Sequence, residues 1–284
     1  MKGQLHSELR QRSAAEIVGE NEVAAFEKDG VVLLKGALHP EWVRLVELGI
    51  ERVLKNDSPY KFTFYAGSDG EFMDATRNYE ITPEFKHLLS LSPIAEVLAR
   101  FMRSENAWLL FDHVFAKEGG TCNRTPWHQD VPYWPVAGDQ LASMWISTGP
   151  LPVEECLEFV KGSHRGPMYD GFNPSEDDPT APLYGEGYPR LPDIESEREK
   201  WDIVAWDIEP GDVVVFHPMA LHGGGPTLYG RRRRALSVRS YGDDVTYDTR
   251  PQDRVTAPPT PGLSLALKPG DPLRHAYYPK IWGD

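Results

Sequence analysis

Residues 107–117 read AWLLFDHVFAK, and this stretch opens a region in which short apolar runs alternate with turn residues. Runs of strand length at such intervals predict an all-β barrel or sandwich. The stretch therefore marks the start of a predicted β core. The later runs of the same kind are MWISTG at 144–149, CLEFVKG at 156–162, DVVVFHP at 212–218 and RALSVRSY at 234–241.

The region before this core is predicted to be largely helical, because apolar residues recur there at a spacing of three or four. One helix face, for example, carries Val23, Phe26 and Ala24. Proline stands near the start of two of these segments, which suits the first turn of a helix. The predicted elements are a helix over 20–28 ended by Gly30, a strand over 31–36, a helix over 39–55 and a helical region over 82–101 that breaks at Pro93.

We expect one domain over residues 1–284, since there is no internal repeat. It divides into a helical N-terminal layer at about 20–105, a β core at about 106–248 and an irregular C-terminal tail at about 249–284. An insertion rich in Pro, Gly, Asp and Glu lies between Arg165 and Asp202. Loops of this length inside a compact domain are usually functional lids or disordered segments, so the insertion is expected to cover a pocket mouth.

Composition narrows the class of protein. Hydrophobic residues make up 40% of the 284 and charged residues 26%, which are ordinary values for a soluble globular protein. The formal net charge is −13. Nucleic-acid binding is therefore not expected, because phosphate affinity comes from clustered Lys and Arg and the one basic run, at 231–234, is short. The expected partner is a small-molecule substrate, and the oligomeric state stays open.

Two cysteines, Cys122 and Cys156, do not make a disulfide framework and are expected to be structural. A reduced, cytoplasmic compartment fits this cysteine usage best. The polar N-terminus shows no secretory signal, and no stretch of about 18 apolar residues predicts a membrane span. We therefore expect no membrane association.

Residues 126–132, PWHQDVP, carry the chemistry. In an extended strand, residues two apart point to the same face, so His128 and Asp130 are expected to project together. A second histidine would complete a face of two imidazoles and one carboxylate. Such a face leaves coordination positions open, as an iron(II) oxygenase requires.

His222 is the preferred third ligand, because it begins LHGGGP, where glycines let backbone approach a bound group closely. His217, at the end of the preceding strand, is the alternative. An HxD pair by itself is a weak signal, since a histidine on a strand is more often structural.

Arg233 follows His222 in the run RRRRALSVRSYGDD. If this run is a strand, Arg233, Ala235, Ser237 and Arg239 share one face. Arginine offers a planar, permanently charged fork for a carboxylate, so Arg233 is the candidate partner for the distal carboxylate of a cosubstrate. The alternative is a solvated charge cluster, which we prefer for Arg231 and Arg232.

The chain resembles the phytanoyl-CoA dioxygenase family of iron(II)- and 2-oxoglutarate-dependent oxygenases. The resemblance rests on an ordered set of segments that spans most of residues 22–245. These segments are FEKDGVVLLKG, TPWHQDVPYWP, ECLEFVKGSHRG, and GDVVVFHPMALHGG followed by RRAL.

The resemblance implies a mainly β, double-stranded β-helix (a cupin-like jelly roll) with N-terminal helices packed on one sheet. It implies Fe(II) held by His128, Asp130 and His222, 2-oxoglutarate held by Arg233, and O2 as the oxidant. The family often places a tryptophan near the cosubstrate, and Trp145 matches, although core packing explains a strand tryptophan equally well. An intact Asp130 favours hydroxylation, since halogenating relatives have a small residue there.

The chain departs from the family pattern at two places near the cosubstrate. Gly224 stands where relatives commonly have a serine, and the asparagine usual a few residues later is missing. One hydrogen bond to the cosubstrate must therefore be replaced or lost.

Substrate contacts are harder to assign. Candidates are the aromatics beside the ligand pair, Trp127, Tyr133 and Trp134, and Arg239, which faces inward with Arg233. The alternatives are core packing for the aromatics and a buried ion pair for Arg239. Either Asp112 or His113 should also face the barrel interior, while His164 is expected to be a turn residue.

The predicted function is an Fe(II)- and 2-oxoglutarate-dependent dioxygenase that hydroxylates a small organic substrate and releases succinate and CO2. Two alternatives remain. One is a metal-dependent cupin enzyme that does not use 2-oxoglutarate, and the other is a non-catalytic jelly-roll binding module.

Overall fold

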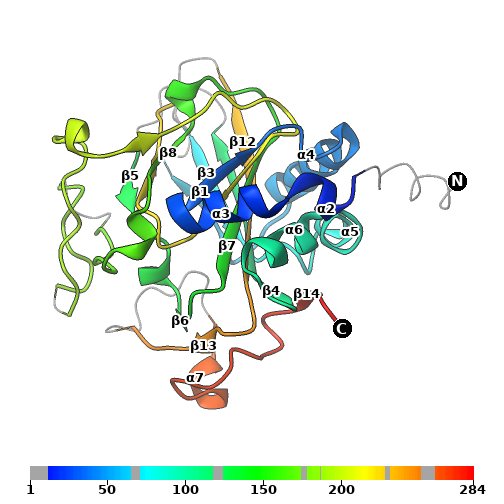
Figure 1. Cartoon of the computed structure of the whole chain (residues 1–284). Coiled ribbons are helices and arrows are strands. Elements are labelled where there is room, and N and C mark those ends of the chain that lie inside the picture. The colour runs from blue at the N-terminus through cyan, green and yellow to red at the C-terminus, as the bar shows by residue number, and fades with distance from the viewer. Residues whose placement is uncertain are drawn as a thin grey trace, which may run out of the picture.

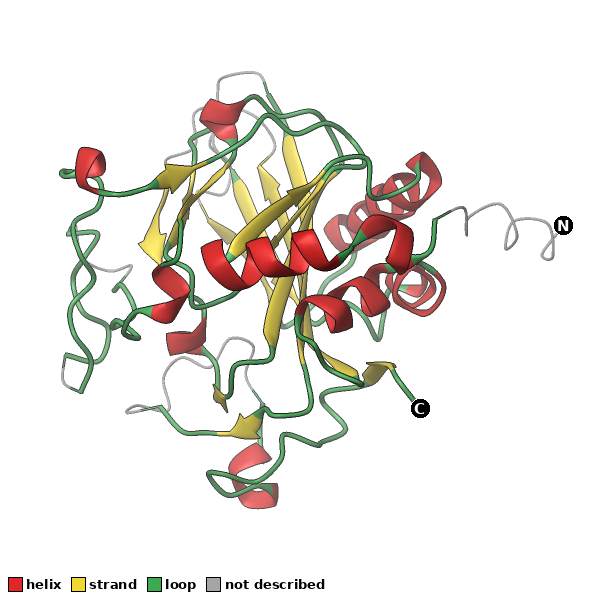
Figure 2. Cartoon of the chain, viewed as in Figure 1, coloured by secondary structure: helices red, strands yellow, loops and turns green. Residues whose placement is uncertain are grey.

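Two antiparallel sheets face each other at the centre of this computed structural model (Figures 1 and 2). The larger sheet has the strand order β1-β10-β7-β12-β4-β3-β2, with β14 paired to β4, and the smaller sheet has the order β5-β11-β8-β9. A short third pairing joins β13 to β6. The structure describes residues 12–64, 71–117, 124–173, 178–185, 187–227, 231–250 and 260–284.

The strands and helices of the described residues have the following bounds. The larger sheet contains β1 Val31–Leu34, β2 Lys61–Phe64, β3 Phe72–Thr76, β4 Ala107–Lys117, β7 Leu141–Ser147, β10 Val213–Phe216, β12 Arg233–Tyr241 and β14 Lys280–Trp282. The others are β5 Thr125–His128, β6 Val136–Ala137, β8 Leu157–Val160, β9 Ile203–Val204, β11 His222–Gly224 and β13 Thr246–Tyr247. The helices are α2 Ala14–Ile17, α3 Glu20–Asp29, α4 Pro40–Lys55, α5 Pro83–Leu91, α6 Ile94–Phe101 and α7 Leu263–Ala266.

Alternation along the central strands separates two apolar layers. On β12, Leu236 and Val238 belong to the cluster formed with the helices, whereas Ala235 belongs to the cluster between the two sheets. On β7, Met144 and Trp145 divide in the same way. Side chains of a strand alternate in this manner, so both faces of the larger sheet are buried.

Helices α2 to α6 cover the outer face of the larger sheet, while the smaller sheet covers its inner face (Figure 1). The fold is therefore mainly β, a jelly roll with N-terminal helices on one sheet, and the predicted fold class is confirmed. No helix formed by the described residues is long and apolar enough to cross a lipid bilayer.

The local predictions hold closely in the helical layer. Helix α3 ends at Gly30, which adopts a left-handed conformation (φ 77°) that costs glycine little. Helix α5 ends at Leu91 and α6 begins at Ile94, so the break lies at Pro93 as expected. Two details were wrong: Ala24 is exposed, and the strand predicted over 31–36 ends at Leu34.

Helix α4 packs closely against α5 through a glycine. Gly49 lies against the ring of Phe85, so that a Cβ atom at position 49 would overlap the ring carbons. Both positions are in the core, since Phe85 is 1% exposed and the neighbouring Ile50 is fully buried. The glycine is therefore retained for space, despite its low helix propensity.

We expect Gly49→Ala to lower the free energy of unfolding by about 1 kcal/mol. Alanine gains about 1 kcal/mol of helix propensity, but overpacking a core costs about 1–3 kcal/mol. Denaturant unfolding measures the difference. The loss should shrink in a Phe85→Leu background, where the smaller side chain makes room. Equal effects in both backgrounds would contradict this steric explanation.

Candidate metal centre

His128 and His222 lie opposite each other on neighbouring strands. His128 ends β5, His222 begins β11, and the two residues are direct partners in the antiparallel register of the smaller sheet. Their ring centroids are 4.2 Å apart. Cross-strand partners point to the same face of a sheet, so both imidazoles project into the space between the two sheets.

Asp130 joins them from just beyond the strand. The sequence prediction placed His128 and Asp130 on one extended strand, and this was wrong: β5 ends at His128, and Asp130 has helical dihedral angles (φ −80°, ψ −39°) before the 3₁₀ turn Val131–Tyr133. The carboxylate nevertheless faces the imidazoles. Its backbone N–H is held by the carbonyl of Pro218 at 2.8 Å, which ties the turn to the β10–β11 connection.

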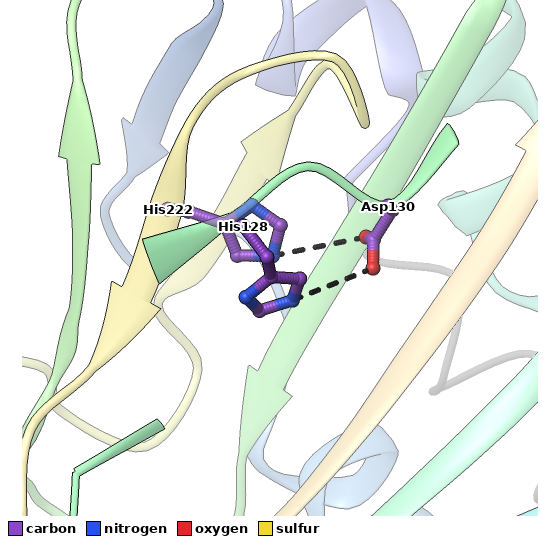
Figure 3. A group of neighbouring side chains, drawn as sticks. All are labelled: His128, Asp130 and His222. Atoms are coloured by element: carbon purple, nitrogen blue, oxygen red, sulfur yellow. Dashed lines mark ion pairs between the residues drawn. The ribbon is translucent and has the colours of Figure 1, made fainter. Parts of the chain in front are cut away.

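The three side chains converge on one point (Figure 3). His128 Nε2 lies 3.8 Å from Asp130 Oδ1, and His222 Nε2 lies 3.8 Å from Asp130 Oδ2. These separations are too long for hydrogen bonds. One ligand atom from each residue lies within 4.8 Å of the others, and no other such group of His, Cys, Asp and Glu occurs in the described part of the chain.

Both imidazoles are fixed in the form that a metal needs. Nδ1 of His128 is 2.8 Å from the carbonyl of Pro126, and Nδ1 of His222 is 2.9 Å from the carbonyl of Ala220. A carbonyl can only accept, so each Nδ1 carries the hydrogen and each Nε2 presents its lone pair to the centre. Histidine ligands are usually oriented by such a bond from the second ring nitrogen.

Burial keeps the two imidazoles neutral. It lowers the pKa of His222 to about 3, against the opposing effect of Asp130, and it also lowers the pKa of His128. A metal requires deprotonated ligands. The donor set of two neutral imidazoles and one carboxylate therefore fits a divalent transition metal, with the open positions typical of non-haem iron(II) oxygenases.

Arg239 forms an ion pair with Asp130. Its Nη1 donates to Asp130 Oδ2, and its Nη2 lies 3.4 Å from Nδ1 of His113. Burial raises the pKa of Asp130, but the positive charge of Arg239 and its hydrogen bond favour the carboxylate, and the pKa is lowered. Arg239 was predicted as a substrate contact with a buried ion pair as the alternative, and the structure has the ion pair.

Arg233 lies at the other end of the inner face of β12. Its Nη1 donates to the carbonyl of Glu155 and, at 3.3 Å, to the carbonyl of Gly225. The residue is 8% exposed. Ser237, between Arg233 and Arg239 on this face, has a buried hydroxyl with no hydrogen-bond partner among the described residues.

The predicted aromatic residues divide between the inside and the outside of the barrel. Trp145 lies between the sheets, in the cluster with Ala235. Tyr133 lies beside the ring of His128, with centroids 6.4 Å apart. Trp134 packs against Arg239, whose guanidinium carbon is 5.1 Å from the indole.

Trp127 differs from the other aromatics. It packs in an outer cluster with Leu191 and Leu221, and its Nε1 donates to Glu195 at 3.0 Å. It therefore occupies the face of β5 opposite His128, and of the two alternatives for Trp127 the structure has packing in an apolar cluster.

The other histidines considered in the sequence, His217, His164 and His113, lie outside the triad. Nε2 of His217, the alternative ligand, is 3.1 Å from the carbonyl of Asp139. His164 packs against α3 from the 3₁₀ turn Ser163–Arg165, with Nε2 3.1 Å from the carbonyl of Glu27. Of Asp112 and His113 on β4, it is His113 that faces Arg239 and the barrel interior.

Asp112 and Cys156 have structural roles. Asp112 points the other way from His113 and accepts hydrogen bonds from Asn78 and Tyr79. Cys156 is a buried free thiol, as expected. Cys122 lies outside the described residues.

The long insertion was predicted to cover a pocket mouth, and part of it packs against the metal centre. The residues that make these contacts were not predicted. Gln129, the middle residue of the HxD pair, accepts from the N–H of Tyr169 at 2.8 Å and donates to the carbonyl of Pro167 at 3.1 Å. Phe172 lies with its ring 5.8 Å from that of His128. No sequence pattern connects residues so far apart in the chain.

Comparison with known proteins gives this arrangement a context. The sequence profile of the phytanoyl-CoA dioxygenase family matches residues 26–235. The chain is 28% identical over 129 residues to the probable phytanoyl-CoA dioxygenase of Caenorhabditis elegans, a stretch that covers 45% of this chain and 39% of that protein. It is 26% identical over 131 residues to the peroxisomal phytanoyl-CoA dioxygenase of Homo sapiens, covering 45% and 37%. The match thus spans about two fifths of these relatives.

Solved structures share the fold. The alpha ketoglutarate dependent carbocyclase SnoK from nogalamycin biosynthesis superposes with a TM-score of 0.72 at 22% identity, covering 95% of this chain and 98% of that one. EctD from S. alaskensis, solved with 2-oxoglutarate and 5-hydroxyectoine, gives 0.66 at 17% identity, covering 92% and 86%. At these identities the likeness establishes architecture.

His222→Ala should abolish stoichiometric Fe(II) binding under anaerobic conditions, because two ligands alone do not hold a labile divalent ion well. The matched control is His217→Ala, which removes another buried imidazole five residues earlier. That variant should still bind about one iron per chain. Metal analysis after gel filtration measures both, and the reverse result would show that the wrong histidine has been chosen.

Arg239→Met should weaken metal binding by about 10- to 100-fold, the usual effect of removing a group that orients a metal ligand. Arg239→Lys, which keeps the charge but not the planar fork, should lose less. Competition with a chromogenic chelator gives the affinities. Unchanged affinity in Arg239→Met would mean that Asp130 is oriented without its partner.

Proposed function

This chain belongs to the phytanoyl-CoA dioxygenase family, as its sequence predicted, and on that premise we propose that it is an Fe(II)- and 2-oxoglutarate-dependent dioxygenase. The reaction proposed is hydroxylation of a small organic substrate with release of succinate and CO2. The observation that carries the proposal is the convergence of His128, Asp130 and His222, with both Nε2 atoms directed at the carboxylate.

Each side chain of the triad has a proposed part in holding iron. His128 and His222 supply neutral nitrogen ligands, and Asp130 supplies the charge that offsets the cation. Bound iron(II) would supply O2 activation coupled to oxidative decarboxylation of 2-oxoglutarate. Because Asp130 occupies the carboxylate position, hydroxylation is favoured over halogenation.

Arg233 is the proposed partner of the distal carboxylate of 2-oxoglutarate. It is the buried arginine at one end of the inner face of β12, and Arg239 at the other end is already paired with Asp130. Two buried hydroxyls, of Ser237 and Thr227, lack hydrogen-bond partners among the described residues. Buried polar groups are normally satisfied, so these hydroxyls support a polar ligand. Ser237, which lies on the same face of β12 as Arg233, is the proposed replacement for the hydroxyl that Gly224 lacks.

The residues around the centre would exclude water from it. Tyr133 and Phe172 flank the His128 ring, and the Tyr133 hydroxyl accepts from the N–H of Phe172 at 2.9 Å. Trp145 closes the space between the sheets. A dry site strengthens electrostatic interactions and protects a reactive oxidant. The proposal includes a single domain and a cytoplasmic location, the latter because Cys156 is a free thiol.

Two alternative functions remain distinct in their chemistry. A cupin enzyme that does not use 2-oxoglutarate would bind metal but would not depend on Arg233. A binding module would need neither metal nor arginine. The buried triad favours a metal-dependent function, because neither Nε2 atom is within hydrogen-bond distance of Asp130 and a metal ion would satisfy both.

Arg233→Ala should weaken 2-oxoglutarate binding by about 10- to 100-fold while Fe(II) binding stays intact, because a charge-assisted hydrogen-bond pair contributes about 1.5–3 kcal/mol. Anaerobic titration of the Fe(II) protein with 2-oxoglutarate gives the affinity, and succinate release across a substrate panel gives turnover. Arg232→Ala is the control, since that neighbour is exposed. Equal affinity in both variants would favour the cupin enzyme that does not use 2-oxoglutarate.

A further inference from the structure

A cavity lies along the edge of β4. It has a volume of about 450 Å³, within the range of small-molecule sites. Strand β4 pairs with β3 from His113 onward and with β14 before Leu109, so its edge between them is open. The cavity occupies this gap, between residues 58–60, 77–81 and 276–279.

The walls of the cavity are mostly aromatic and apolar, and one cation lies among them. Its apolar lining includes Tyr60, Leu110, Phe111 and Tyr277. The guanidinium carbon of Arg77 is 4.4 Å from the centroid of the Tyr277 ring and 5.8 Å from that of Tyr60. The arginine is therefore held between two rings, a geometry that orients its planar fork.

The guanidinium of Arg77 is incompletely paired. Its Nε and Nη2 atoms are buried and have no hydrogen-bond partner among the described residues. A buried donor without a partner is costly, and more so when it belongs to a charged group. Such a group indicates a ligand that completes its hydrogen bonds.

The backbone of Arg77 is also unusual. Its φ is 55°, in the left-handed region that residues other than glycine rarely adopt. The turn is held there by Asp112, whose carbonyl accepts from Arg77 N–H at 3.2 Å and whose carboxylate accepts from the N–H groups of Asn78 and Tyr79. Strained residues that the surroundings hold so firmly are often found at ligand sites.

Arg103 provides an internal comparison. Among the described residues, Arg77 and Arg103 are the two that are not glycine and have a positive φ, which is 47° at Arg103. Its guanidinium is fully engaged, since it pairs with Glu20 and Glu27. Arg77 has no such carboxylate partner among the described residues. Its guanidinium lies against the rings of Tyr60 and Tyr277 instead.

The acidic groups of the cavity do not neutralise Arg77. Both carboxylate oxygens of Asp112 accept hydrogen bonds from the 78–79 turn and are directed toward it. Glu80 is exposed at the rim. The cavity therefore presents a positive fork in an apolar setting, which is complementary to an organic acid with an apolar body.

Phe111 lies between this cavity and the metal centre. Its side chain lines the cavity, and its ring centroid is 5.4 Å from the guanidinium carbon of Arg239. Arg239 in turn donates to Asp130. One aromatic ring and one arginine thus separate the cavity from the proposed iron ligand.

We infer that this cavity binds the carboxylate end of the substrate through Arg77, so that the compound oxidised is a small organic acid with an apolar or aromatic body. The identity of the occupant as a substrate rests on the proposed function. The existence of a carboxylate site at Arg77 rests on the cavity alone.

The test uses the full chain loaded with Fe(II) and 2-oxoglutarate under anaerobic conditions. Calorimetry measures binding of benzoate, 3-phenylpropionate and hexanoate, each beside its primary amide as an uncharged match. Admission of air then allows succinate release to be measured with each compound. We expect at least one carboxylate to bind and to stimulate succinate release, and its amide to do neither.

Arg77→Leu should weaken binding of that carboxylate by about 10- to 100-fold, the usual effect of losing a charge-assisted pair of hydrogen bonds. Arg77→Gly should lose binding equally while raising the melting temperature, because glycine adopts the left-handed conformation freely. Arg103→Leu is the matched control and should bind like the wild type. The affinity for 2-oxoglutarate should be the same in all of them.

Three results would overturn the inference: no carboxylate of the panel binds, the amides bind as well as the acids, or Arg77→Leu binds unchanged. A carboxylate that binds through Arg77 without stimulating succinate release would overturn its role as substrate. Failure of the proposed function itself would appear separately, as absence of 2-oxoglutarate binding by the wild-type protein.

Discussion

The site depends on one cross-strand pair. His128 and His222 are direct partners in the register of β5 and β11. Each donates from Nδ1 to the backbone carbonyl of the residue two positions earlier in the sequence. The strand register fixes where the rings lie, and the carbonyls fix which nitrogen faces inward. A slip of one residue would turn one ring to the opposite face of the sheet. The smaller sheet, though short, therefore determines the chemistry.

The larger sheet provides the surroundings of that pair. Its strand β12 directs Arg239 at Asp130 and places Arg233 and Ser237 further along the same inner face. The helices bury the outer face of this sheet, and the pairing of β12 with β4 is regular up to the register shift after Arg239. Gln129 links the insertion to the ligand turn, so the cover of the site and the site itself are parts of one hydrogen-bonded unit.

Sequence patterns predicted most of this fold because they record local physics. Helical spacing, Gly30 and Pro93 identified the helical layer, and alternation placed Arg233 and Arg239 on one face of β12. The misses lie where tertiary contacts decide. Asp130 reaches the centre from a turn stabilised by Pro218, which lies far along the chain, and Trp127 faces outward because Glu195 and the insertion pack there. Neither the open edge of β4 nor the strain at Arg77 has a sequence signature.

The most direct measurement is a crystal structure of the chain grown anaerobically with Fe(II), with the metal located from its anomalous scattering. We expect a single strong peak at about 2.0–2.2 Å from Nε2 of both histidines and from one oxygen of Asp130, as for nitrogen and oxygen ligands of divalent metals in general. A peak at any other group of side chains, or none at full iron loading, would contradict it.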